Sequence, residues 1–137
     1  MLKGFEEQTH ALNEYETNTL LPLMVEGFKN KVGKENAVTN KHICTSLKQM
    51  GYKVDAPRVR KIVSYIRINH LVPLLIATSK GYWISNDKQE IQDWIETMNG
   101  RIQSLVASRD AVIHEYKVMN LRDAIQPQGI QIMIPNN

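Results

Sequence analysis

Basic side chains recur at helical spacing between residues 55 and 69. Asp55 is a good helix cap and Pro57 suits a first turn. At about 100° per residue, one face carries the apolar residues Val59, Ile62, Val63 and Ile66. The opposite face carries Lys61, Ser64 and Ile68, flanked by Arg58, Arg60, Tyr65 and Arg67. Arg and Lys hydrogen-bond to guanine O6 and N7 and to phosphates, and Ser and Tyr reach base edges or phosphates. This helix therefore predicts a surface that reads the major groove of duplex DNA.

The charge of the chain is concentrated around this helix. Residues 27–84 hold eleven Lys and Arg but only two acidic residues, a net charge of +9, whereas the rest of the chain carries −6. A block of one sign attracts polyanions over roughly a Debye length. Two alternatives stay open: the helix is an ordinary amphipathic helix with a solvated basic face, or its basic face docks an acidic protein.

Other chemistries find little support in the sequence. The KVGKE loop lacks the first Gly and the final Ser or Thr of a phosphate-binding loop, because Phe28 and Glu35 stand there. His42 and Cys44 are two residues apart on a predicted helix and face apart, and the other His residues are scattered. We therefore expect no enzymatic activity, no metal site and no cofactor, and we expect Cys44 to be a residue beside the core.

Two predicted helices precede the basic one. The first has Asn18 or Thr19 as its cap and a broad apolar face, and it ends before Gly33. The second runs from a cap at Thr39 to a stop at Gly51. Its first turn is expected to offer free N–H groups and side chains to a phosphate, through Thr39, Asn40 and Lys41.

A hairpin is predicted directly after the basic helix. Two β-prone runs, residues 75–78 and 82–85, flank Ser79-Lys80-Gly81, which suits a three-residue loop with a left-handed Gly. Lys80 at the tip is placed to reach a flanking groove or backbone, or is simply a polar turn residue. Tyr82 and Trp83 are expected to pack on the helices.

The chain then changes to a long helical pattern over residues 87–119. Its apolar positions alternate steps of four and three, a heptad stripe interrupted by Arg109 and crossed by Asn99-Gly100, which could kink the helix. Such a helix either folds back onto its own domain or pairs with a second copy, and we favour the homodimer. The predicted dimerisation residues are Ile91, Ile95, Met98, Ile102, Leu105, Val112 and Tyr116.

These patterns divide the chain into four parts. We expect a polar lead-in (1–17), a winged helix-turn-helix domain (18–86), the long helix (87–119) and an irregular tail (120–137) with a possible short strand over Ile130–Ile134. The fold class is mainly α with a small β-hairpin. One cysteine, no apolar run near the ~18 residues of a membrane span and no secretory signal predict a cytoplasmic protein without membrane contact.

The chain resembles the small winged-helix proteins encoded by bacteriophages and bacterial mobile elements. The resemblance covers roughly residues 20–119 and rests on three segments: ENAVTNKHICTSLKQMG, RVRKIVSYIR and LLIATSKGYWIS. It implies a sequence-specific or structural DNA-binding protein without enzymatic activity. Together with the charge pattern, it leads us to expect a regulator or accessory factor of DNA metabolism in a prokaryote or a phage-infected host. Many winged helices bind proteins instead, and an assembly role of the long helix is a third alternative.

Overall fold

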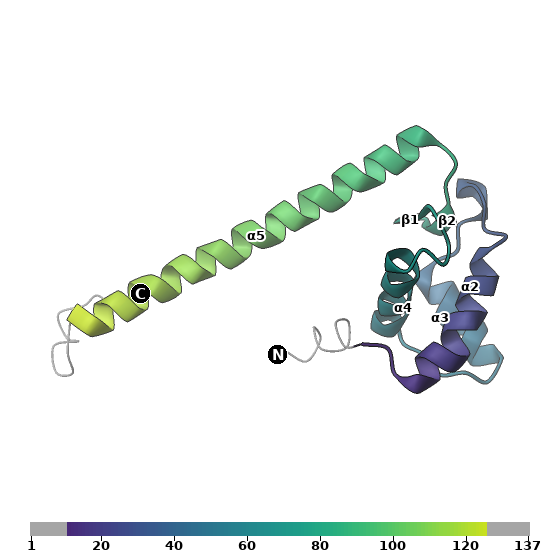
Figure 1. Cartoon of the computed structure of the whole chain (residues 1–137), viewed down its shortest axis with the longest axis horizontal. Helices are drawn as coiled ribbons and strands as arrows, with labels where there is room; N and C mark the ends of the chain where they lie inside the picture. Colours follow the sequence, from purple (N-terminus) through teal and green to yellow (C-terminus); the bar gives the residue numbers. More distant parts are fainter. Residues whose placement is uncertain (1–10, 126–137) are drawn as a thin grey trace. The chain divides into compact units, whose positions relative to one another are not determined.

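The computed structural model describes residues 11–125, which form a mainly α-helical chain with one small β-hairpin (Figure 1). The elements in chain order are η1 (Glu16–Leu20), α2 (Leu21–Phe28), η2 (Lys34–Asn36), α3 (Asn40–Gln49), α4 (Ala56–Ile68), β1 (Leu75–Thr78), β2 (Gly81–Ile84) and α5 (Lys88–Ile125). The chain divides into two compact units after Trp94. We call residues 11–94 the head and residues 95–125 the arm. No helix in this described stretch has the length and apolar character needed to cross a membrane.

The first helical segment begins at Glu14, ahead of the predicted cap at Asn18 or Thr19. Its start is a capping box: the Glu16 backbone N–H donates to Asn13 Oδ1 at 2.8 Å, and the Asn13 N–H donates to Glu16 Oε1 at 3.0 Å. The helix passes through the π-helical turn η1 directly into α2. The predicted start at Asn18 or Thr19 was wrong because the Asn13–Glu16 pair, spaced as a capping box, starts the helix upstream.

The two central helices begin and end as predicted. Thr39 Oγ1 accepts from the His42 N–H at 3.0 Å at the start of α3, and Asp55 Oδ1 accepts from the Arg58 N–H at 3.0 Å at the start of α4. Gly51 has φ +89°, a conformation that ends α3 without the strain a side chain would bring. Local hydrogen bonding therefore sets both helix boundaries.

The hairpin forms where predicted, but its loop is shorter. Thr78 pairs with Gly81, so Ser79 and Lys80 alone make the turn instead of the predicted three residues. Gly81 has φ +118°, and a Cβ atom there would lie 2.4 Å from the Val38 carbonyl oxygen. Gly81 is therefore required both by the turn and by the close passage of the chain before α3.

The segment between α2 and α3 is more ordered than the basic loop that the sequence predicted. Val38 exchanges two backbone hydrogen bonds with Tyr82, at 2.9 and 2.7 Å. Ile84 donates to the Lys31 carbonyl at 2.7 Å and accepts from the Gly33 N–H at 3.0 Å. This segment thus occupies the outer edge of β2 and ties the hairpin to the helices.

One hydrophobic core holds the head together. The inward stripe predicted for α4 is buried, each residue at most 1% exposed. Trp83 is also buried, as predicted, and its Nε1 donates to Glu90 at the start of α5 at 3.3 Å. The core comprises Leu20, Leu21, Met24, Phe28, Ile43, Leu47, Val59, Ile62, Val63, Ile66, Val72, Leu75 and Tyr82. The order of three helices and a hairpin over this core is compatible with a winged helix.

Helix α5 is longer than predicted. Asp87 caps it, accepting from the Gln89 and Glu90 N–H groups at 2.8 and 3.2 Å. It runs unbroken through Asn99-Gly100 and ends at Ile125, so the irregular tail predicted from Asn120 is wrong for residues 120–125. The possible strand over 130–134 lies outside the described residues.

Candidate nucleic-acid interface

The outward face of α4 presents three of the predicted DNA-binding side chains. Arg60 is exposed, and Lys61 and Ser64 are partly exposed. Within residues 11–125, none of the three side chains has a hydrogen-bond or ion-pair partner. Ile68, on the same face, is 71% exposed. This strip is therefore free to contact another molecule.

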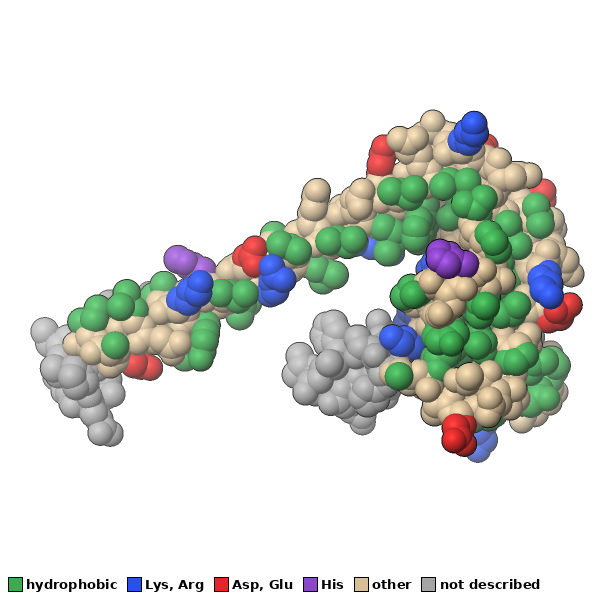
Figure 2. Space-filling view, in the orientation of Figure 1, with side chains coloured by type: hydrophobic (Ala, Val, Ile, Leu, Met, Phe, Trp, Pro, Cys, Tyr) green, Lys and Arg blue, Asp and Glu red, His purple; other side chains and the backbone are tan. Residues whose placement is uncertain are grey.

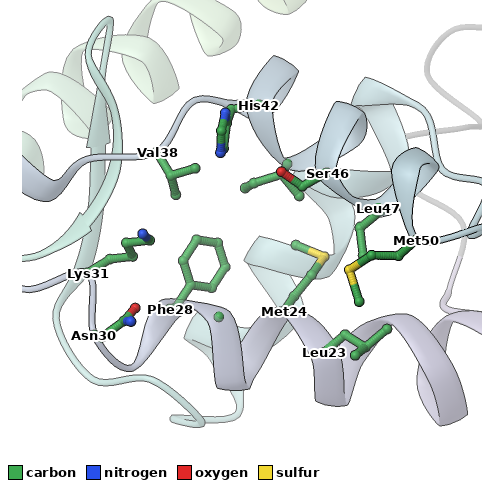
Figure 3. Close-up of a pocket in the computed structure, with 12 residues that line it drawn as sticks. Leu23, Met24, Phe28, Asn30, Lys31, Val38, His42, Ser46, Leu47 and Met50 are labelled. Carbon is green, nitrogen blue, oxygen red and sulfur yellow. The ribbon is translucent and has the colours of Figure 1, made fainter.

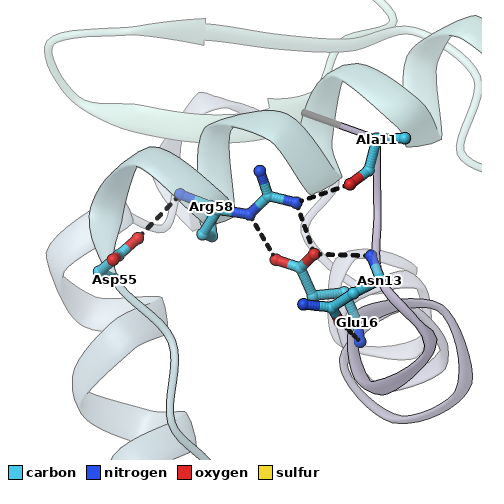
Figure 4. Close-up of polar contacts among 5 residues, drawn as sticks. All are labelled: Ala11, Asn13, Glu16, Asp55 and Arg58. Atoms are coloured by element: carbon cyan, nitrogen blue, oxygen red, sulfur yellow. Dashed lines mark hydrogen bonds and ion pairs between the residues drawn. The ribbon is translucent and has the colours of Figure 1, made fainter. Parts of the chain in front are cut away.

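Arg58 does not belong to that free strip, contrary to the prediction. Its guanidinium makes a bidentate ion pair with Glu16, with Nε 2.6 Å from Oε2, and Nη2 donates to the Ala11 carbonyl at 3.1 Å (Figure 4). The side chains of Arg58 and Glu16 are only 16% and 4% exposed. Hydrogen bonds from Arg58 hold the pKa of the Glu16 carboxyl below its usual range, although burial opposes this. Arg58 thus fastens α4 to the first helix.

Arg67 is likewise turned inward rather than toward a groove. Its Nε donates to the Leu75 carbonyl at 2.7 Å, and its guanidinium carbon lies 4.9 Å from the ring centroid of Trp94. Burial lowers the pKa of this guanidinium. Nη2 is buried without a hydrogen-bond partner among the described residues. Tyr65, also predicted as a contact, packs against the core. Arg67 therefore joins α4 to strand β1 of the hairpin and to the start of α5.

The predicted contact residues on α3 and on the hairpin likewise include side chains that the fold uses and side chains that are open to a partner. Asn40 Nδ2 donates to the Ala56 carbonyl and to the Tyr82 hydroxyl, both at 3.2 Å, so this side chain braces the head. Thr39 is exposed but its hydroxyl caps α3. Lys41 and Lys80 are exposed at the start of α3 and on the turn. Among the predicted contact residues, the cations that remain open to a partner are Lys41, Arg60, Lys61 and Lys80.

The environment of Cys44 does not activate its thiol. Burial, with the nearby Asp55 carboxylate, raises the thiol pKa, and Arg60 opposes this only in part. The Sγ lies 3.5 Å from Asn40 Oδ1. In the described part of the chain, no three His, Cys, Asp or Glu side chains cluster in a way that could hold a metal ion.

A hollow of about 340 Å³ lies between α2 and α3, which the sequence did not predict (Figure 3). Its lining is mostly apolar, including Met24, Phe28 and Met50, with Lys31 and His42 as the titratable groups. Met50 is 58% exposed.

The predicted dimerisation stripe on α5 is open to solvent for most of its length. Ile91 and Met98 are partly exposed, while the others are 47–67% exposed. Figure 2 shows hydrophobic side chains along this helix. The exposed members are Ile95, Ile102, Leu105, Val112 and Tyr116. Surface of this kind indicates an interface with a partner.

No protein family, curated protein or solved structure matches this chain. The resemblance to winged-helix proteins of phages and mobile elements therefore stays a prediction, and only the mainly helical fold with its hairpin is shown.

Proposed function

We propose that this protein is a non-enzymatic winged-helix protein whose head binds duplex DNA through the outward face of α4. The observation that carries the proposal is the pair Arg60 and Lys61, which have no intramolecular partner among the described residues and lie within a block of net charge +9. Lys41 and Lys80 supply phosphate contacts at the start of α3 and on the turn of the hairpin. We assign it a role as a regulator or accessory factor of DNA metabolism in the cytoplasm of a prokaryote or phage-infected cell.

The test replaces both central cations. Arg60→Glu with Lys61→Glu should lower affinity for a duplex selected from a randomised pool by about 30-fold or more, since each good base contact contributes about 1–3 kcal/mol. The matched control is Lys88→Glu with Lys117→Glu, which changes the net charge equally on α5. Fluorescence anisotropy measures binding, and circular dichroism checks the fold. Equal affinities of the two variants would contradict the proposal.

A second candidate is a protein partner with an acidic surface. It is supported by Ile68, whose exposed side chain lies on the same face of α4 as Lys61 and would serve as an apolar anchor in a protein interface. Selection from the randomised pool separates the two candidates. An enriched base sequence supports DNA binding, whereas salt-sensitive binding to an acidic protein, with no preference among the DNA sequences of the pool, favours the second candidate.

We further propose that a second copy covers the exposed apolar stripe of α5, making a homodimer. A two-copy assembly would present two heads, as dimeric DNA-binding proteins commonly do. Light scattering gives the mass of the particle. A monomer would contradict this part of the proposal, and a very large oligomer would favour an assembly role.

A further inference from the structure

The apolar stripe of the arm has the spacing of a coiled coil. Its residues alternate steps of four and three, a mean period of 3.5 residues, which keeps one seam facing a partner helix along its whole length. Ile95, Ile102, Arg109 and Tyr116 stand at the a positions, and Met98, Leu105, Val112 and Met119 stand at the d positions. The described arm has no buried residue.

A second copy of the same helix fits this seam because it offers the same period and length. Arg109 then discriminates between the two possible orientations. In a parallel pair, a faces a, so Arg109 would share a layer with the partner's Arg109, and two like charges would be placed together. In an antiparallel pair, a faces d, and each Arg109 meets an apolar residue instead.

We infer that two arms pair antiparallel, with Arg109 of one opposite Leu105 of the other. The inference rests on the proposed self-pairing of α5 and adds its direction and register. In this register each of the four a residues faces a d residue. The layers join Ile95 to the partner's Met119, Ile102 to the partner's Val112, Arg109 to the partner's Leu105, and Tyr116 to the partner's Met98.

Charges beside the seam support this register. Arg101 and Glu115 stand at g positions, which flank the seam. In an antiparallel pair, g positions meet g positions, so Arg101 of each chain meets Glu115 of the other and two equivalent ion pairs form. A shift of one heptad would place Arg101 against the partner's Ser108 or Arg122 and would lose the ion pairs. A parallel pair would instead set Arg101 against the partner's Val106.

The e positions agree with the same arrangement. Val106 and Ile113 stand there, and both remain more than a third exposed. In the antiparallel register Val106 meets the partner's Val106 at the centre of the pair, which extends the apolar contact there, while Ile113 meets the partner's Asn99. In a parallel pair these two residues would face polar side chains, the partner's Arg101 and Ser108.

Disulfide trapping tests the orientation. In a Cys44→Ala background, Ile102→Cys and Val112→Cys chains carrying tags of different size are refolded together and oxidised. The antiparallel register brings residue 102 of one chain to residue 112 of the other. The mixed disulfide should therefore exceed either homodimeric disulfide at least fivefold.

The outcomes separate this inference from the self-pairing on which it rests. A dimer in which the disulfides form mainly between two copies of the same variant is parallel, and it overturns the inference but not the self-pairing. A dimer that forms no disulfide has the same consequence. A monomer overturns both.

Charge exchange provides an independent test. Arg101→Glu should weaken dimerisation about tenfold or more, because it sets two Glu pairs face to face across the dimer. Adding Glu115→Arg should restore the wild-type dissociation constant, measured by sedimentation. Lys117→Glu, the same charge change on the solvent-facing side of the arm, should have little effect. Failure of the double exchange to restore dimerisation would rule out this register.

Discussion

The buried pair of Glu16 and Arg58 allows the sharpest stability prediction. Glu16 accepts two hydrogen bonds from Arg58 and one from the Asn13 N–H, with its side chain only 4% exposed. Glu16→Gln preserves size but removes the negative charge, leaving the Arg58 guanidinium poorly compensated in a nearly buried position. Removing one partner of a buried pair costs about 3–5 kcal/mol. Because glutamine keeps one acceptor oxygen, we expect a loss of about 2–4 kcal/mol in the free energy of unfolding.

The chain offers a matched control. Glu26 pairs with Lys29 at 2.9 Å, but these side chains are 76% and 61% exposed. Glu26→Gln should therefore cost less than about 1 kcal/mol. Urea unfolding followed by tryptophan fluorescence reports both values, since Trp83 is buried in the head.

The pH dependence of the same variant gives a further check. The pKa of Glu16 is lowered in the folded state, so its stabilising effect is complete above the ordinary carboxyl pKa of 4.5 and is lost as pH falls through the folded-state pKa. The difference in stability between wild type and Glu16→Gln should shrink toward acid. Equal costs for the Glu16 and Glu26 variants, or a difference that grows on acidification, would refute the reasoning.

Three further substitutions test the fold. Gly81→Ala should cost about 2 kcal/mol or more, because its Cβ would meet the Val38 carbonyl at 2.4 Å and its φ is +118°; unchanged urea unfolding would contradict this. Gly100→Ala, with open space around the new Cβ atom, should stabilise α5 by up to about 1 kcal/mol, seen as a higher melting temperature of the helical signal, and a lower one would count against it. Arg67→Lys should cost about 1–3 kcal/mol and alter Trp94 fluorescence; a neutral result would remove its assigned role.

Local patterns predicted the helices and the hairpin well. Thr39, Asp55 and Gly51 act through hydrogen bonds and backbone angles within a few residues, so their effects can be recognised in a short stretch of sequence. The start of the first helix could have been found from the Asn13–Glu16 spacing in the same way. The extension of α5 to Ile125 was missed because the apolar stripe stops before the helix does.

The candidate site was only partly predictable. Helical spacing gave the direction in which each α4 residue leaves the helix, and Arg60 and Lys61 lie on the outward face as expected. Helical spacing could not show that the guanidinium groups of Arg58 and Arg67, on the flanks of this face, reach partners elsewhere in the head. An Arg side chain is long, so its guanidinium can turn toward whichever acceptor tertiary packing brings near.

By itself, the sequence determined the order of elements, the inward stripe of α4, the basic block and the heptad seam of α5, because these depend on neighbours a few positions apart. Tertiary structure decided which cations are free. Arg58 meets Glu16 across 42 positions of sequence, and the Lys31–Val38 segment meets β2 across more than 40. Contacts at such separations arise only when the core brings the elements together, and they limit the candidate interface to the cations that the fold itself does not use.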